Sequence, residues 1–372
     1  MAKTTSQNNL GQLLIVGFDG TEMTSRLSFL LKRVRPAGVI LFARNIRNPE
    51  QTWQLLSECQ KCVETPLFTC VDLEGGSVDR LRDVLGPTPS AAEVFAADDP
   101  LLYRKHGQVI GENCRAMGFN VDFAPVLDLA LEASQSVMGM RAVSPEPSRT
   151  AAYAREFLSG LKAARVLGCG KHFPGLGEGK LDSHHDLPVI EKSMRKLWVE
   201  DLVPYRMLAR QLPFVMISHA AYPQVTGART PASLSKMWIT EILRKRIGYR
   251  GLIVSDDLEM GGVRSAAPVQ DAAGEFVRAG GDLCLVCRRE DYILQAHEAL
   301  IMNVERDRHF ARRVADSVKR VLWFKKRWQK ELHGGKAPSA SAFAKMSRRL
   351  WEFGEQVRLG PLSRREDRRR RA

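Results

Sequence analysis

The chain has 372 residues, of which 44% are hydrophobic and 26% charged, a composition ordinary for a globular protein with a sizeable core. The longest apolar runs, such as LLIVGF and DLCLVC, fall far short of the roughly 18 residues that a membrane span needs, which argues against an integral membrane protein. The net charge of +14 raises the alternative of a nucleic-acid-binding protein, but much of the excess lies in RKRIGYR and in SRREDRRRRA, and a terminal run of like charges is typical of a solvated tail.

The first residues, MAKTTSQNNLGQ, contain no apolar segment of the kind found in signal peptides, so the sequence predicts a cytoplasmic protein. We expect it to be a monomer.

Seven cysteines include two pairs with C-x-x-C spacing, Cys59 with Cys62 and Cys284 with Cys287, which raises the alternative of a zinc site. The first pair lies in a helical pattern. The second lies in a strand pattern, where residues three apart face opposite sides. We therefore expect packed thiols, with neither a metal nor another cofactor.

Short apolar or β-branched runs recur along the chain, and stretches with helical spacing of apolar residues separate them. The expected strands are residues 13–18, 38–42, 66–74, 121–128, 167–174, 213–220, 251–257 and 282–287. Strand alternating with helix indicates parallel pairing, and eight such units predict a (β/α)8 barrel of the TIM type.

A doubly wound open sheet is the structural alternative, but VGFDGTEMTS after the first strand is not a glycine-rich dinucleotide fingerprint. We expect a single catalytic domain over residues 1–332. GGKAPSASAFAK reads as a linker, so residues 333–372 are expected to form a linker and a basic C-terminal helical or disordered extension.

The carboxyl ends of the expected strands carry polar residues, and these ends form the active-site face of such a barrel. They are Asp72 and Glu74, Asp128, Lys171 and His172, His219, and Asp256 with Asp257. Acidic and cationic side chains on one rim are suited to a metal, a phosphate or a sugar.

The segment KHFPGLGEGKLDSHHDLP, residues 171–188, follows the fifth expected strand and reads as a loop because of its glycines and prolines. Asp182 and His184 stand two apart, so they project to the same side of an extended backbone. A carboxylate in that position can orient an imidazole for proton transfer. The alternative is a solvated surface turn.

Six ordered motifs resemble glycoside hydrolase family 3, most of all its single-barrel β-N-acetylglucosaminidases of bacterial cell-wall recycling (NagZ-like). They are GVILFARN, VDLEGGSVDRLRD, VDFAPVLDL, KHFPGLGEGKLDSHHDLP, PFVMISHAAYP and GLIVSDDLEMGGV. The resemblance covers roughly residues 11–330 and implies a (β/α)8 barrel that removes terminal β-linked N-acetylglucosamine by a retaining mechanism, with muropeptide-type fragments as substrates.

The resemblance also implies roles for individual residues. Asp256 is the nucleophile, although periodicity alone leaves Asp256 and Asp257 open, and His184 oriented by Asp182 is the acid/base. The residues implied to bind the sugar are Asp72, Arg80, Arg141, Lys171, His172 and His219.

Three positions depart from the family pattern: Leu176 stands where a histidine is usual, Ser77 where an arginine is common, and RAV at 141–143 replaces RSF. They leave the specificity open, with β-glucosidase or β-xylosidase activity as alternatives. Because a deprotonated histidine is neutral and does not repel an anionic acceptor, phosphorolysis to a sugar 1-phosphate is a further alternative. A catalytically silent sugar-binding barrel is the alternative outside the enzyme class.

Overall fold

The computed structural model describes residues 9–179, 186–332, 337 and 339–371. Within them, eight parallel strands close into a barrel in the order β1-β10-β9-β8-β7-β6-β3-β2, which confirms the predicted (β/α)8 fold. The barrel strands are β1 Leu14–Val16, β2 Gly38–Ile40, β3 Phe68–Val71, β6 Val121–Asp122, β7 Leu167–Phe173, β8 Phe214–Ile217, β9 Leu252–Asp257 and β10 Leu283–Val286.

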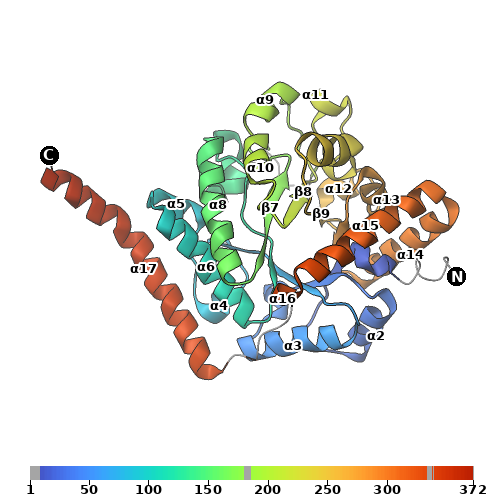
Figure 1. Ribbon diagram of the computed structural model, residues 1–372, viewed down its shortest axis with the longest axis horizontal. Helices are drawn as coiled ribbons and strands as arrows, with labels where there is room; N and C mark the ends of the chain where they lie inside the picture. The colour runs from blue at the N-terminus through green and yellow to red at the C-terminus, as the bar shows by residue number, and fades with distance from the viewer. Residues whose placement is uncertain (1–8, 180–185, 333–336, 338, 372) are drawn as a thin grey trace.

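Helices surround the strands on all sides (Figure 1). The longer ones are α2 Ser25–Val34, α3 Pro49–Lys61, α6 Pro100–Ala116, α8 Pro147–Ala163, α10 Leu202–Leu208, η6 Met237–Arg246, α13 Val269–Ala279, α14 Glu290–Arg306, α15 Arg308–Arg327 and α17 Ala340–Arg371. The shorter ones are η1 Leu10–Leu13, η2 Ala43–Asn45, α4 Arg82–Leu85, α5 Ala91–Ala96, η3 Glu132–Ser134, α7 Gln135–Met138, η4 Gly139–Arg141, α9 Met194–Val199, α11 Pro223–Thr226, η5 Ala232–Leu234, α12 Gly261–Arg264 and α16 Gln329–Leu332. No helix in the described part of the chain combines the length and the apolar character that a bilayer crossing requires.

Each barrel strand is shorter than the apolar run that predicted it, and in two of the runs the buried chain continues in other structure. The run 66–74 divides into β3 and the hairpin strand β4 Leu73–Gly75, which pairs antiparallel with β5 Val78–Asp79. In the run 121–128 only β6 is regular strand, followed by a single bridge between Val126 and Lys171. An apolar run indicates that a segment is buried, not that it is strand. In both runs the chain stays largely buried after its regular hydrogen bonding to the neighbouring strands ends.

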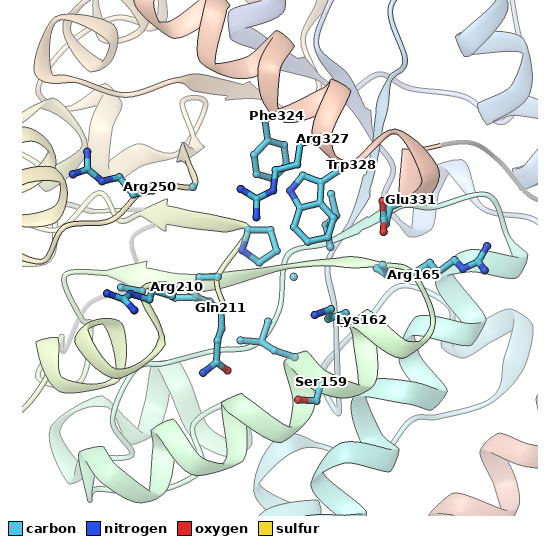
Figure 2. A pocket seen from close by; sticks show the side chains of 18 of the residues that line it. Ser159, Lys162, Arg165, Arg210, Gln211, Arg250, Phe324, Arg327, Trp328 and Glu331 are labelled. Carbon is cyan, nitrogen blue, oxygen red and sulfur yellow. The ribbon is translucent and has the colours of Figure 1, made fainter.

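The barrel has a cavity at each end. One of about 350 Å³ lies at the carboxyl ends of the strands, lined by residues of β7, β9 and the β4–β5 hairpin among others. A larger one of about 760 Å³ lies at the amino ends, lined from residues 165–168, 209–213 and 248–251, which lead into β7, β8 and β9 (Figure 2).

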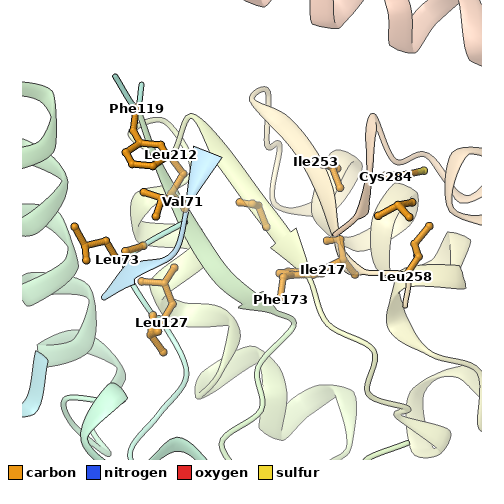
Figure 3. Close-up of a cluster of buried hydrophobic side chains, with 14 of the residues drawn as sticks. Val71, Leu73, Phe119, Leu127, Phe173, Leu212, Ile217, Ile253, Leu258 and Cys284 are labelled. Atoms are coloured by element: carbon orange, nitrogen blue, oxygen red, sulfur yellow. The ribbon is translucent and has the colours of Figure 1, made fainter. Parts of the chain in front are cut away.

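The core has two layers because successive strand residues face opposite sides. In β1, Ile15 belongs to the cluster inside the barrel, whereas Leu14 and Val16 pack outward under the helices. Figure 3 shows part of the outer cluster, with Ile217 of β8 and Ile253 of β9 among its members.

The helices α6 and α8 pack unusually close, and two glycines permit it. A Cβ on Gly107 would lie 2.0 Å from the carbonyl oxygen of Phe157, and one on Gly160 would lie 2.1 Å from that of Arg104. Backbone therefore meets backbone at this contact, which leaves no room for a side chain.

The first part of α17 packs against α6, on the outside of the barrel (Figure 1). Its buried side chains recur at helical spacing, which forms one apolar stripe. Phe353 stacks on His106 of α6 with ring centroids 5.6 Å apart. The stripe consists of Met346, Leu350, Phe353 and Val357.

The seven cysteines are free thiols, and all but Cys62 are buried. Among the described residues no cluster of histidine, cysteine and carboxylate side chains has the arrangement of a metal site. Cys59, Cys284 and Cys287 are members of the two core clusters, and Cys62 packs partly buried beside them.

Candidate active site

The cavity at the carboxyl ends of the strands gathers most of the residues that the sequence predicted for the site. The predicted residues that line it are Asp72, Arg80, Arg141, Lys171, His172 and Asp256. Asp182 and His184 lie outside the described residues. His219 does not line the cavity.

A buried charge network forms one wall. The Lys171 Nζ lies 2.8 Å from Asp72 Oδ1 and 2.6 Å from Glu74 Oε1. Arg141 donates two hydrogen bonds to the Glu74 carboxylate, from Nε (2.7 Å) and Nη2 (2.9 Å). Glu74 is 4% exposed and Lys171 is 2% exposed, so these charges are compensated by one another and not by water.

Electrostatics keeps Glu74, Arg141 and Lys171 charged. Burial by itself would raise the pKa of Glu74, but the Arg141 and Lys171 cations outweigh it and hold this pKa well below its usual range. Burial likewise acts to lower the pKa of Lys171, but Asp72 and Glu74 outweigh burial and raise it. A substrate hydroxyl that reaches this wall meets fixed ionic partners.

A third carboxylate, Asp128, holds His172 and the backbone after it. His172 Nδ1 donates to Asp128 Oδ2 at 2.6 Å, and the His172 amide donates to the same oxygen at 3.1 Å. The other oxygen, Oδ1, accepts from the Leu176 amide at 2.7 Å. Because Nδ1 carries the proton, the His172 ring is fixed with Nε2 as its remaining polar atom.

The two neighbouring aspartates at the end of β9 differ in their surroundings. Asp257 Oδ1 accepts from the amides of Glu259 (3.0 Å) and Cys287 (3.2 Å), so this carboxylate joins two loops. Burial is the largest cause that raises the pKa of Asp257, to about 7. Asp256 accepts from the amide of Asp257 at 2.9 Å, and both aspartates line the cavity.

His219 lies behind β9 and not in the cavity. Its Nε2 donates to the carbonyl oxygen of Asp257 at 3.0 Å, and its Nδ1 accepts from the Ser233 hydroxyl at 2.8 Å. Burial lowers its pKa, which favours this neutral form. The structure thus differs from the expected sugar contact: both ring nitrogens bind protein groups, and His219 supports the strand end that carries Asp256.

The open side of the cavity is rich in arginine. The Arg44 and Arg80 guanidinium groups lie over the ring of Phe42, 4.5 Å and 5.6 Å from its centroid. Arg80 Nε is buried and has no hydrogen-bond partner among the described residues. Arg288 also lines this side. A buried donor of this kind calls for an acceptor, which a ligand can supply.

A buried lysine ties together the two ends of the segment that carries Asp182 and His184. Lys192 Nζ lies 2.6 Å from Asp201 Oδ2, 2.9 Å from Glu200 Oε2 and 3.6 Å from Glu178 Oε1. Glu178 precedes residues 180–185 and Lys192 follows them, so this cluster joins described chain on either side of those residues.

Of the residues that depart from the family pattern, Leu176 lies in the cavity and Ser77 lies outside it. Leu176 lines the cavity and is 6% exposed, so it presents an apolar surface to a ligand. Ser77 is exposed at the β4–β5 turn and does not line the cavity.

Sequence reasoning noted Glu74 and Asp128 only as strand-end acids and assigned them no role, and it did not single out Arg44 or Arg288. A signal existed for the first two, since each is the last residue of an expected strand. Which cation each acid would meet depends on neighbouring strands and could not be read from spacing.

Comparison with known proteins agrees with this arrangement. The model of the glycosyl hydrolase family 3 N-terminal domain matches residues 5–323. A curated beta-hexosaminidase of Bordetella avium is 38% identical over 287 residues, which cover 75% of this chain and 81% of the relative. One from Pseudomonas aeruginosa is 36% identical over 277 residues, with 74% and 82% covered.

Two solved structures extend the comparison to three dimensions. A family 3 β-N-acetylglucosaminidase from Paenibacillus superposes with a TM-score of 0.86 at 32% identity, covering 93% of this chain and 68% of that one. NagZ from Neisseria gonorrhoeae, in complex with N-trifluoroacetyl-D-glucosamine, superposes with a TM-score of 0.70 at 29% identity, covering 83% and 98%. The chain therefore belongs to glycosyl hydrolase family 3 and is a glycoside hydrolase.

Proposed function

We propose that the protein is a retaining β-N-acetylglucosaminidase that removes terminal β-linked N-acetylglucosamine, with muropeptide-type cell-wall fragments as its substrate class. The observation that carries the proposal is the carboxylate of Asp256 in a cavity of about 350 Å³ whose wall is a fixed set of ionic and imidazole groups. Beta-hexosaminidases and β-N-acetylglucosaminidases among the relatives support the choice of sugar.

In the first step the Asp256 carboxylate attacks the anomeric carbon, and the bond from that carbon to the leaving oxygen breaks. His184, oriented by Asp182, gives its proton to the leaving oxygen. Water then loses a proton to His184 and attacks the glycosyl ester, which restores both groups and releases the sugar with its original configuration. A histidine suits this double role because its ordinary pKa lies near neutral pH.

The charge pattern supports Asp256 over Asp257 as nucleophile. The Asp257 carboxylate is engaged by two backbone amides, and its raised pKa of about 7 leaves it partly protonated at neutral pH. A protonated carboxyl group is a poor nucleophile.

The sugar is held by the network on the wall. Asp72 and Lys171 can accept from and donate to neighbouring hydroxyls, and His172 Nε2 is available to a third. Arg80, whose buried Nε has no partner among the described residues, gains one when a sugar oxygen binds. Such groups accelerate the reaction to the extent that they bind the transition state more tightly than the substrate.

The arginines on the open side support an anionic aglycone. Arg44 and Arg288 line the cavity, and a single carboxylate, Asp19, pairs with both, at 2.9 and 3.2 Å, so the two guanidinium groups keep a net positive charge. Muropeptide-type fragments carry carboxylates, which such guanidinium groups bind well. A neutral chitin-like fragment would not use these cations.

The test compares p-nitrophenyl β-glycosides of N-acetylglucosamine, glucose and xylose, with wild type, Asp256→Asn and Asp257→Asn. We expect a preference for N-acetylglucosamine, and loss of about three orders of magnitude or more in turnover for Asp256→Asn with the fold intact. Asp257→Asn should retain measurable activity, because an amide oxygen still accepts from both backbone amides. If Asp257→Asn is inactive and Asp256→Asn turns over at the wild-type rate, the nucleophile assignment is wrong.

A further inference from the structure

The cavity at the amino ends of the strands lies at the opposite end of the barrel from the candidate active site. Its volume is about 760 Å³, and its walls are the end of α8, the segments leading into β7, β8 and β9, and the end of α15 with α16 (Figure 2). This volume lies within the range typical of small-molecule sites, about 300–1,000 Å³. None of the residues proposed for glycosidase activity lines it.

Cationic side chains predominate around this cavity. Glu331 is the one carboxylate among the described lining residues. No ion pair joins any of the cations to a carboxylate within the described ranges, and all of them are exposed. They come from α8, from the segments before β7, β8 and β9, and from α15, and they are Lys162, Arg165, Arg210, Arg250 and Arg327. Positive charge without a compensating anion inside a concave surface attracts anionic ligands.

Aromatic rings accompany these cations. Trp323 is 54% exposed, which is unusual for so large an apolar side chain, and Trp328 is half-buried beside it. The Arg327 guanidinium lies 5.4 Å from the ring of Trp323 and 6.0 Å from that of Trp328. Figure 2 shows Arg327 and the Trp328 indole next to each other on the α15 side, with Lys162 on the α8 side.

The α15 side of the cavity is anchored to residues at the amino ends of the barrel strands. Phe324 packs edge-on against Phe214 at 5.3 Å and Phe68 at 6.1 Å. The next residue, Lys325, is buried and donates from Nζ to Gln12 Oε1 and the Ala37 carbonyl oxygen, both at 2.8 Å. These contacts fix the backbone from which Trp323, Arg327 and Trp328 project, which reduces the entropic cost of binding.

These features select among ligand classes. A second neutral sugar needs acceptors for its hydroxyl protons, and this cavity offers mainly donors, with Glu331, Gln211 and Ser159 as its acceptor side chains among the described residues. An anion with a flat ring satisfies both features, since phosphate pairs with Arg and Lys, and a nucleobase stacks on an aromatic ring.

We propose that this cavity is a second ligand site that binds a nucleotide, with the base stacked on Trp323 and the phosphates paired with Lys162 and Arg327. Gln211 and Ser159 line the same cavity and supply hydrogen bonds to the base or ribose. The site is separate from the glycosidase site and does not depend on the function proposed for that site.

Isothermal titration of the full chain at about 150 mM salt, where long-range surface attraction is largely screened, tests the proposal. The probe is ADP, with adenosine and inorganic pyrophosphate as its two halves. We expect saturable binding of one ADP per chain, at least about tenfold tighter than either half, since stacking and phosphate pairing each contribute.

Two variants and a matched control locate the site. Trp323→Ala and Arg327→Gln should each weaken ADP binding by about tenfold or more. Arg312→Gln is the control, because Arg312 is an exposed arginine on the same helix that does not line the cavity. It should bind ADP within about twofold of wild type, because a charge remote from the ligand is screened. Thermal unfolding of all three establishes that they are folded.

Several results would overturn the proposal. Pyrophosphate that binds as tightly as ADP, or an unchanged affinity in Trp323→Ala, would show that no base is stacked. Equal losses in Arg327→Gln and Arg312→Gln would indicate general attraction to the basic chain. Displacement of ADP by N-acetylglucosamine would place the nucleotide in the glycosidase cavity instead.

Discussion

Replacement of Glu74 by Gln should weaken the fold and the candidate active site together, because one buried carboxylate balances two cations. Glu74 receives two hydrogen bonds from Arg141, at 2.7 and 2.9 Å, and lies 2.6 Å from Lys171. The substitution preserves size and shape but removes the negative charge. Arg141 and Lys171 then remain in a place from which water is largely excluded.

The loss of unfolding free energy in Glu74→Gln depends on the ion pairs that Lys171 and Arg141 keep. Breaking a buried ion pair costs about 3–5 kcal/mol. Lys171 keeps Asp72 at 2.8 Å, so the lower end applies, about 3 kcal/mol. For a protein of this size, 1 kcal/mol shifts the unfolding midpoint by about 2 °C, which gives a fall of about 6 °C. Misplacement of sugar-binding groups by about 1 Å should reduce kcat/KM about 100-fold.

The assay combines thermal unfolding followed by circular dichroism with turnover of an aryl β-N-acetylglucosaminide. The control is Glu298→Gln, which removes a carboxylate from an ion pair with Arg33 whose side chains are about half exposed. This control should lose less than about 1 kcal/mol and keep full activity. A Glu74→Gln protein that unfolds at the wild-type temperature and turns over at the wild-type rate would refute the reasoning.

The pH dependence supplies an independent check. The folded-state pKa of Glu74 lies below its ordinary value of 4.5, so its stabilisation is present above that pH and is lost as the pH falls below it. The stability difference between wild type and Glu74→Gln should therefore shrink below pH 4.5. A difference that stays constant through this range would mean that charge is not its source.

Three further predictions concern proton transfer by His184, the group that attacks the glycosyl-enzyme, and the buried Lys325. His184→Ala and Asp182→Asn should slow glycosides with poor leaving groups more than activated aryl glycosides; equal losses on both would make the pair structural. Reactions in phosphate and in non-phosphate buffer of equal ionic strength should both give free N-acetylglucosamine, whereas a sugar 1-phosphate product would establish phosphorolysis. Burial lowers the pKa of Lys325 to about 7, so wild-type unfolding free energy should rise from pH 7 to pH 9, by at most about 1.4 kcal/mol per pH unit. Lys325→Met should lack this rise in denaturant titrations, and an equal rise in both proteins would contradict the assignment.

The barrel could be predicted from the sequence because each of its units is local. A buried strand followed by an amphipathic helix leaves a pattern within about 40 residues, and eight such patterns occur in order. The expected strands 66–74 and 121–128 extend too far because buried chain leaves the sheet in both runs. Buried residues just beyond a strand are as apolar as residues within it, so the apolar composition of a run does not show where the strand ends.

Much of the candidate site could also be anticipated, since parallel strands bring their carboxyl ends together. Asp72, Lys171, His172 and Asp256 meet at one cavity for this reason. The pairing between them could not be anticipated: whether Arg141 finds Glu74 or Asp72 depends on where the loop after β6 returns. His219 stands at a strand end like the others, yet its ring faces Ser233 and the backbone of β9.

The sequence by itself determined the order of the strands and helices and the residue types at the strand ends, because hydrophobic periodicity and position along the chain are properties of short segments. Only the tertiary structure decided which charges became partners, since that depends on contacts between segments far apart in the chain. The amino-end cavity shows this most clearly. Its five cations come from separate segments, in each of which an exposed lysine or arginine reads as an ordinary solvated charge. Closure of the barrel places them around one concave surface beside two tryptophans, where their charges add.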